Sequence, residues 1–218
     1  MPVPIVNPAV EALRSLPAPG AYLCGLTWDG TYLWHSDQQA GRVYALDPDD
    51  GTVLHTVACP GVRADLTFHG GRLWQIGERP KRFLVLDPRT GEVVERRAIR
   101  PSNGRICGAE ARPEGIWVCL RRPAVVQLRS AGSVDVLKEF PVAGNPSGLT
   151  EVDGVVYYTD FEDVVVRGYD VATGEQVFSE PATGSPTGLT YDGRYLWYCD
   201  FPGRALRAIA PLDRGARP

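Results

Sequence analysis

Two carboxylates, Asp65 and Glu110, could do chemistry because they depart from a repeated motif. Asp65 stands where the four other copies of the motif have Gly, and Glu110 stands where the four other copies have Thr. A carboxylate pair in a partly desolvated channel can bind a divalent cation such as Ca²⁺ or Mg²⁺, or split its pKa values to serve as acid and base. The alternative is structural, with both carboxylates paired to the nearby Arg63, Arg79, Arg105 and Arg121.

A cluster of basic residues accompanies these carboxylates in the second and third copies. It comprises Arg63, Arg79, Lys81, Arg105, Arg121 and Arg122. Arginine offers a planar pair of donors to a carboxylate or phosphate, so the cluster predicts a small anionic ligand. The alternative is a solvated rim that Glu78 and Glu110 balance. The residues expected to contact a substrate are Tyr22, Arg63, Glu78, Arg79, Arg105, Arg121, Phe161 and Phe201.

Histidine and cysteine offer further reactive groups. His35 is an acid/base candidate, although it cannot form a triad with Ser36 and Asp37, because consecutive strand residues face opposite sides. The five cysteines are an odd set without a C-x-x-C pair, which argues against a disulfide scaffold and a zinc site. Cys24 shares one position of the repeat with Cys107, and Cys119 shares another with Cys199. Each is expected to be a small buried residue, with a nucleophile or soft-metal ligand as the alternative.

These residues belong to a unit of about forty residues that occurs five times. The copies begin at Gly25, Asp65, Gly108, Gly148 and Gly188, which are 40, 43, 40 and 40 residues apart. Each copy contains short β-branched and aromatic segments bounded by Asp, Pro and Gly turns, the pattern of four antiparallel strands. Four strands per repeat of this length are typical of a propeller blade. The sequence therefore predicts an all-β, five-bladed propeller formed by residues 1–218 as a single domain.

The two ends of the chain complement each other. The fifth unit stops after three strands, near residues 205–210, whereas residues 9–17 match the fourth strand of the other units. The N-terminal strand is therefore expected to complete the last blade and close the ring, which removes exposed sheet edges.

The propeller fold determines where the candidate residues meet. The start of the first strand and the end of the second strand lie on the same face of every blade, so these positions converge on a central funnel. The repeated Asp37, Asp160 and Asp200 are expected to make hydrogen bonds in turns. The repeated Trp34, Trp74, Trp117, Tyr157 and Trp197 are expected to form the core between blades.

Composition excludes some classes of function. A formal net charge of −3 gives no electrostatic case for binding nucleic acid or an anionic membrane surface. No apolar run approaches membrane-spanning length, and the N-terminus lacks the features of a signal peptide. We expect a soluble, cytoplasmic, monomeric protein with a small-molecule ligand, and neither a nucleic acid nor a membrane as partner.

The motif resembles those of a broad group of bacterial propellers. Gly25-Leu-Thr-Trp-Asp-Gly30, followed by a strand that ends in Leu46-Asp-Pro, is similar to the virginiamycin B lyase-like, strictosidine synthase-like and lactonase-like groups. Tyr22-Leu-Cys-Gly-Leu26 and Leu33-Trp-His-Ser36 resemble the F-T-Q-G-L and L-Y-E-S segments of the five-bladed glutamine cyclotransferase family. The Gln of that family is Cys24 here and its functional Glu is His35, so the resemblance implies the scaffold and not cyclase activity.

Two functions follow as hypotheses. The first is an enzyme of lyase or cyclase type that acts on a polar or anionic substrate in the funnel. Glu110, Asp65 and His35 would be its catalytic groups, and a divalent cation on Asp65 and Glu110 could assist. The second is a non-catalytic propeller that binds a small molecule or a protein on its funnel face.

Overall fold

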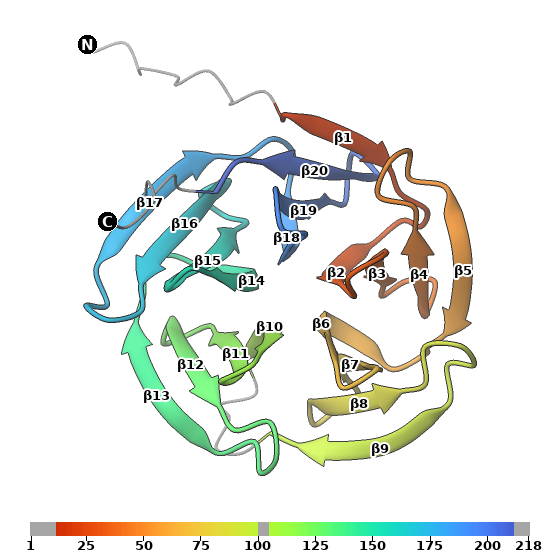
Figure 1. Cartoon of the computed structure of the whole chain (residues 1–218), viewed down its shortest axis with the longest axis horizontal. Coiled ribbons are helices and arrows are strands. Elements are labelled where there is room, and N and C mark those ends of the chain that lie inside the picture. Colours follow the sequence, from red (N-terminus) through yellow and green to blue (C-terminus); the bar gives the residue numbers. More distant parts are fainter. Residues whose placement is uncertain (1–11, 100–104, 212–218) are drawn as a thin grey trace.

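Five four-stranded antiparallel sheets stand around a central axis in the computed structural model, which describes residues 12–99 and 105–211 (Figure 1). The first blade has β2 (Leu23–Trp28), β3 (Leu33–Asp37), β4 (Arg42–Leu46) and β5 (Val53–Ala58). The second has β6 (Val62–His69), β7 (Arg72–Gly77), β8 (Arg82–Leu86) and β9 (Val93–Ala98). The third has β10 (Ile106–Arg112), β11 (Gly115–Leu120), β12 (Val125–Arg129) and β13 (Val136–Pro141).

The last two blades repeat this pattern with one difference. The fourth blade has β14 (Pro146–Val152), β15 (Val155–Asp160), β16 (Val165–Asp170) and β17 (Gln176–Pro181). The fifth has β18 (Pro186–Tyr191), β19 (Leu196–Asp200) and β20 (Ala205–Ile209), and its outermost strand is β1 (Arg14–Pro17). The expected all-β, five-bladed architecture is confirmed. The innermost strands are β2, β6, β10, β14 and β18 (Figure 1).

Ring closure by the N-terminal strand is also confirmed. Strand β1 pairs antiparallel with β20, with Leu16 opposite Leu206. One residue earlier than the strand, the amide of Leu13 donates to the carbonyl of Ala208 at 2.8 Å. The strand was expected over residues 9–17, of which residues 9–11 lie outside the described part of the chain. Closure leaves the last blade with the same number of strands as the others.

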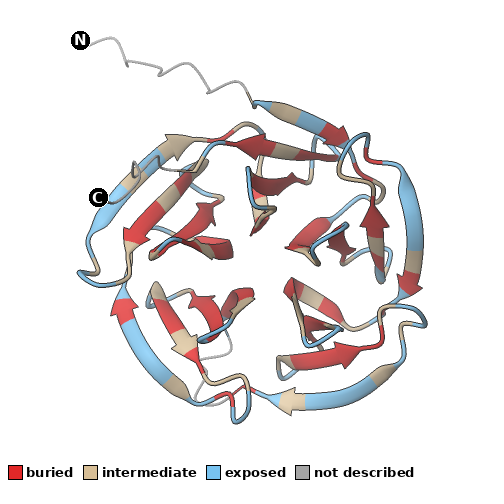
Figure 2. Ribbon diagram, in the orientation of Figure 1, coloured by how far each residue is buried: buried red, intermediate tan, exposed pale blue. Residues whose placement is uncertain are grey.

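The core lies between neighbouring blades. Five buried clusters each combine side chains from two adjacent sheets, such as Trp74 and Phe83 of the second blade with Ile106 and Ile116 of the third. The five aromatic residues expected in this core are all at most 5% exposed, which confirms that prediction. Figure 2 shows the same gradient, with buried inner strands and exposed residues along the outer strands.

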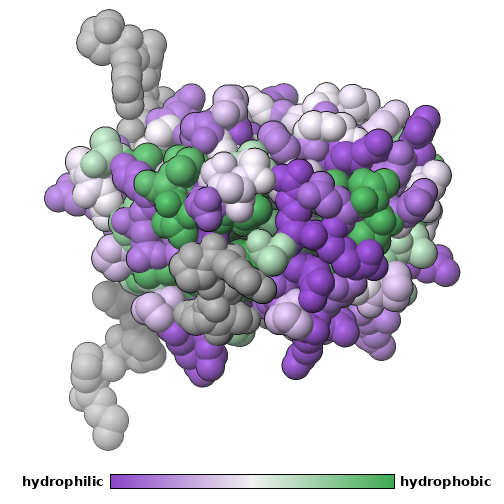
Figure 3. Space-filling model, turned by 90° about the horizontal axis from the view of Figure 1, so that it is seen from below, coloured by the Kyte–Doolittle hydropathy of each residue, from purple (hydrophilic) through white to green (hydrophobic). Residues whose placement is uncertain are grey.

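The outer surface of the disc is mixed in polarity. The side view in Figure 3 shows hydrophobic areas that hydrophilic side chains separate. Val94 of β9 and Leu137 of β13 are among the exposed apolar residues, at 50% and 60%. No helix in the described ranges is long and apolar enough to cross a membrane.

Candidate functional site

The innermost strands approach one another so closely that a single side chain fits between them at one level of the axis. A Cβ atom on Gly148 would lie 2.3 Å from the nitrogen of Leu189, and one on Gly188 would lie 2.6 Å from the nitrogen of Leu26. Gly25 and Gly108 are equally confined. The fifth position of this layer is Asp65, which is completely buried. Four glycines therefore leave room for the one carboxylate.

Asp65 occupies this space with hydrogen bonds to main-chain amides of three other blades. One oxygen accepts from Leu26 at 2.9 Å, and the other accepts from Ala109 at 3.2 Å and from Leu149 at 3.4 Å. These amides belong to strand edges that face the axis and have no neighbouring strand to pair with. Burial raises the pKa of Asp65 well above its usual range, against the effect of the amide donors. The carboxylate completes the hydrogen bonding of the axis.

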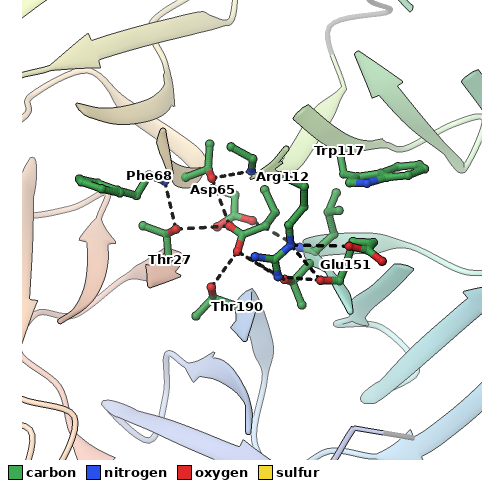
Figure 4. A network of polar contacts seen from close by, with 12 residues as sticks. Thr27, Asp65, Phe68, Arg112, Trp117, Glu151 and Thr190 are labelled. Atoms are coloured by element: carbon green, nitrogen blue, oxygen red, sulfur yellow. Dashed lines mark hydrogen bonds and ion pairs between the residues drawn. The ribbon is translucent and has the colours of Figure 1, made fainter. Parts of the chain in front are cut away.

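Glu110 forms a second layer in the same channel, and Figure 4 shows its partners Thr27, Thr190 and Arg112 gathered around the axis beside Asp65. Its carboxylate accepts hydrogen bonds from four threonine hydroxyls, one from each of the other blades, and it is 3% exposed. The donors are Thr190 at 3.0 Å, Thr67 at 3.1 Å, Thr27 at 3.3 Å and Thr150 at 3.4 Å. Burial raises its pKa from 4.5 to about 7, while Arg112 and the hydroxyl donors act in the opposite direction.

Arg112, which the sequence reasoning missed, lies beside this layer. Its guanidinium is 3.8 Å from an oxygen of Glu110 and donates to the carbonyl of Glu151 and the hydroxyl of Thr150. The sequence does contain a signal for it. Arg112 follows Glu110 by two residues on one strand, so both side chains face the same side. The structure thus corrects the expected pairing, because Asp65 and Glu110 are bonded to main-chain amides, threonines and Arg112 rather than to Arg63, Arg79, Arg105 or Arg121.

The groups that surround both carboxylates are hydrogen-bond donors, and such surroundings do not suit a divalent cation. A hard cation needs several oxygen lone pairs directed at one point. Here the oxygens of Asp65 are directed at N–H groups, and those of Glu110 at hydroxyl groups and a guanidinium. Across residues 12–99 and 105–211, no group of three or more His, Cys, Asp or Glu side chains that could hold a metal ion is found.

A cavity of about 400 Å³ opens on the funnel face. It is lined by Tyr22, Cys24, Gln38, Arg63, Ala64, Lys81, Cys107, Arg121, Ser147, Phe161, Ser185, Thr187 and Phe201. The innermost strand of every blade has an irregular register beside its axial Gly or Asp, for example between Ile106 and Gly108. Such bulges redirect a side chain. Those at Cys24, Cys107, Ser147 and Thr187 all line the cavity.

Three cationic side chains, Arg63, Lys81 and Arg121, line this cavity. Lys81 donates to the carbonyl of Ile106 at 2.6 Å, and Arg121 donates to the carbonyl of Pro146 at 2.6 Å. Arg63 bonds to the carbonyl of the preceding Val62. Burial lowers the pKa of Lys81, and the charge of Arg121 adds to this effect. A smaller hollow of about 180 Å³ is lined by Lys81, Arg105, Cys107 and Arg121.

Aromatic rings line the rest of the cavity. The rings of Tyr22 and Phe201 are 5.1 Å apart, and the guanidinium of Arg121 lies 4.5 Å from the ring centre of Phe161. Tyr22, Arg63, Arg121, Phe161 and Phe201 of the expected substrate-binding set therefore share one cavity, and Arg105 lines the adjoining hollow.

Three other candidates lie away from this cavity lining. Glu78 forms ion pairs with Arg82 at 3.2 Å and Arg96 at 3.0 Å, and Arg79 is an exposed residue. His35 is completely buried and stacks on Tyr44 at 5.0 Å. Burial lowers its pKa to about 4, and neither ring nitrogen has a hydrogen-bond partner.

The three repeated aspartates make the turn hydrogen bonds expected of them. Asp37 accepts from the amides of Tyr22 and Ala40, at 2.9 and 2.6 Å. Asp160 and Asp200 make equivalent contacts in their own blades. They shape the loops that carry Tyr22, Phe161 and Phe201 into the cavity.

Solved structures share this fold at low sequence identity. Glutaminyl cyclase from Myxococcus xanthus has a TM-score of 0.73 and 14% identity, over 91% of this chain and 94% of that one. A catalytically inactive virginiamycin B lyase from Staphylococcus aureus, crystallised with quinupristin, has a TM-score of 0.53 and 15% identity, over 90% and 69%. A chain of a nidogen/laminin complex has a TM-score of 0.62 and 14% identity, over 86% and 75%.

Sequence comparison adds no relative. No protein-family model matches the chain, and neither does any curated protein sequence. At these identities the structural matches establish the fold alone. The resemblance to propellers of the glutaminyl cyclase and virginiamycin B lyase type is a resemblance of scaffold.

Proposed function

We propose that the protein binds a small anionic molecule in the funnel cavity. The observation that carries this proposal is the composition of the lining, which has Arg63, Lys81 and Arg121 and no carboxylate. Within the described ranges, neither Arg63 nor Lys81 forms an ion pair with an acidic side chain. Partly buried cations are costly without a counter-charge, so a ligand with a carboxylate or phosphate group is the complementary partner.

The lining offers cationic and aromatic side chains to the two ends of such a ligand. The anionic group would lie against Lys81 and Arg121, and an apolar or aromatic group against Phe161, Phe201 and Tyr22. A volume of about 400 Å³ is near the lower end of the range for small-molecule sites. The ligand is therefore a metabolite-sized molecule rather than a polymer segment.

Calorimetric titration tests this proposal with phenyl phosphate, phenylacetate and the neutral benzyl alcohol. We expect the two anions to bind, with affinity that falls as salt increases, and the alcohol not to bind. Arg63→Gln or Arg121→Ala should weaken binding about 10- to 100-fold, the value of one charged hydrogen bond. Arg79→Gln is the matched control, because Arg79 lies outside the lining. Equal binding of alcohol and anions, or equal losses in all three variants, would reject the site.

An enzyme of lyase or cyclase type is a second candidate, and Lys81 favours it. The lowered pKa of this amine suits a general base, which could remove a proton from a substrate held by Arg63 and Arg121. Asp65, Glu110 and His35 do not line the cavity, so the acid/base role moves to Lys81. That the fold neighbours include a cyclase and a lyase accords with this candidate.

Proton NMR on a panel of carboxylates and phosphate esters that carry a β-leaving group tests the enzyme. The expected result is an unsaturated or cyclised product with the native protein and none with Lys81→Arg. That variant should still bind phenyl phosphate, because it keeps the charge. Turnover by Lys81→Arg at the native rate would remove Lys81 as the base.

A further inference from the structure

The third blade has a cysteine at two neighbouring positions that hold at most one cysteine in the other blades. Cys107 is the bulge residue before Gly108, and Cys119 pairs with Gly108 from the next strand. Their sulfur atoms are 3.6 Å apart. The equivalent pairs are Cys24 with Ser36, Ala64 with Ile76, Ser147 with Thr159, and Thr187 with Cys199.

Only one thiol of this pair faces the cavity. Cys107 lines both the main cavity and the smaller hollow, and it is 7% exposed. Cys119 lies behind it at 0% exposure. On the next blade, the carbonyl oxygen of Pro146 lies 3.0 Å from the sulfur of Cys107, and that of Ser147 lies 3.2 Å from the sulfur of Cys119. A small reagent that enters the cavity therefore meets Cys107 first.

The surrounding charges favour the thiolate of Cys107. The bond from the Cys119 thiol and the charges of Arg121 and Lys81 outweigh burial and lower the pKa of Cys107. The proton stays on Cys119, whose pKa burial raises. Cys24 occupies the same position in the first blade, faces Ser36 instead of a thiol, and has its pKa raised to about 12 by burial. The two cavity cysteines thus differ in their neighbours and not in their place in the fold.

We propose that Cys107 and Cys119 are a redox-active pair that reacts with hydroperoxides in the cavity. The thiolate sulfur of Cys107 attacks one peroxide oxygen, the O–O bond breaks, and the departing hydroxide or alkoxide takes up the proton that the Cys107 thiol had released to solvent, leaving as water or an alcohol. Cys107 is then a sulfenic acid. The sulfur of Cys119 attacks the sulfur of Cys107, water leaves with the proton of the Cys119 thiol, and a disulfide forms. The peroxide is reduced by two electrons, and an external dithiol restores both thiols.

The geometry allows this disulfide with small movements. A disulfide needs a sulfur separation of about 2.0 Å, so the two sulfurs must approach by about 1.6 Å. The link would join β10 and β11, which are already paired. The blade can therefore keep its strand register during oxidation.

Intact mass and peptide mapping of the full chain after treatment with hydrogen peroxide test the proposal. We expect the native protein to lose the mass of two hydrogen atoms, to yield a Cys107–Cys119 linked peptide, and to recover its mass with dithiothreitol. Linkage of any other pair, or retention of all five thiols under conditions that oxidise a free thiol, would overturn it.

Single variants separate the two roles. Cys119→Ser should retain the reaction at Cys107 and accumulate a sulfenic acid that dimedone traps, whereas Cys107→Ser should leave Cys119 unreacted. Cys24→Ser is the matched control and should oxidise like the native protein. Circular dichroism of each variant confirms folding. A dimedone adduct on Cys24 in place of Cys107 would show that the reactive thiol lies in the first blade, and it would overturn the proposal.

Ser36→Cys tests the role of the charges, because it places a second thiol pair in the first blade without Lys81 and Arg121 beside it. We expect that pair to oxidise about tenfold more slowly than the native pair, since it lacks the stabilised thiolate. Equal rates would show that proximity alone drives the reaction and would overturn the part assigned to the cations. Binding of the anionic ligand is measured in a separate experiment, so the outcome of the oxidation tests does not depend on whether the cavity binds an anion.

Discussion

The hydroxyl of Thr190 donates a hydrogen bond of 3.0 Å to Glu110, although 80 residues separate them in the sequence. Together with the three equivalent threonines, this bond connects the innermost strands of all five blades through one carboxylate. The stability of the whole ring is therefore linked to the protonation of one side chain.

Glu110→Gln should make the protein less sensitive to alkaline pH. Folding raises the pKa of Glu110 from 4.5 to about 7, so its contribution is fully present below pH 4.5 and is lost as the pH rises through 7. Between pH 5 and 8 the native protein should lose about 2 kcal/mol relative to the variant. Urea unfolding at both pH values measures this difference. Glu175→Gln, at an exposed residue, should parallel the native protein. A constant gap between Glu110→Gln and the native protein would contradict the linkage.

Gly148→Ala should strongly destabilise the protein, because the new Cβ would meet main-chain atoms of the next blade at 2.3 Å. We expect a loss of about 3 kcal/mol or more, as for overpacking against a backbone that cannot move aside. Gly132→Ala is the control, since the nearest atom to its Cβ would be 3.7 Å away. Thermal unfolding distinguishes them. If Gly148→Ala melted at the same temperature as the native protein, the innermost strands would have to be less closely packed around the axis than described.

Asp65→Ala should also be destabilising, for the opposite reason. It empties the one filled position of the axial layer and leaves the amides of Leu26, Ala109 and Leu149 without their acceptor. Each unsatisfied buried amide costs about 1–3 kcal/mol. Asp65→Asn keeps an acceptor and should retain much of the stability in chemical denaturation. Equal stabilities of the two variants would argue against the hydrogen-bonding role.

His35→Phe should be neutral or stabilising. Both ring nitrogens of His35 are buried without a hydrogen-bond partner. Their desolvation is therefore uncompensated, and an apolar ring in their place removes that unfavourable contribution to folding. The variant should also resist acid better between pH 6.5 and 4, because folding lowers the pKa of His35 to about 4.

Gln75 has the same position in the second blade and donates to the carbonyls of Ala64, Asp65 and Ile76. Gln75→Leu should therefore cost about 1–3 kcal/mol. A larger loss for His35→Phe than for Gln75→Leu in urea unfolding would reverse this assignment.

Removal of residues 1–17 should open the ring. The truncation takes away β1 and Leu16, which is 5% exposed and packs against the core between the first and last blades. Losing that side chain alone costs about 2–5 kcal/mol. Removal of residues 1–11, which keeps β1, is the control. Calorimetric melting should show a large decrease for the longer truncation only, and similar melting of both would contradict closure by β1.

The repeat was sufficient to predict the blades and their closure, because five similar units fix both the strand pattern and the missing partner strand. Comparison of the units also singled out Asp65 and Glu110. Their surroundings could not be predicted, since the sequence does not show how closely Gly148 approaches Leu189. That approach is what makes a single odd residue fill a layer. Likewise, Glu78 directly follows β7, and this position predicts that its side chain faces the funnel. The structure instead pairs Glu78 with Arg96 on the outer strand β9.

The two filled layers also determine how molecules can move. With Asp65 and Glu110 sealing the axis, the funnel cavity has a floor, and the molecule is a cup rather than a tube. With the axis closed by these two layers, we expect a ligand to enter and leave on the funnel face, beside the lining residues Tyr22, Phe161 and Phe201. Exchange on that face, and not flow along the propeller axis, would then limit how fast ligand and oxidant exchange.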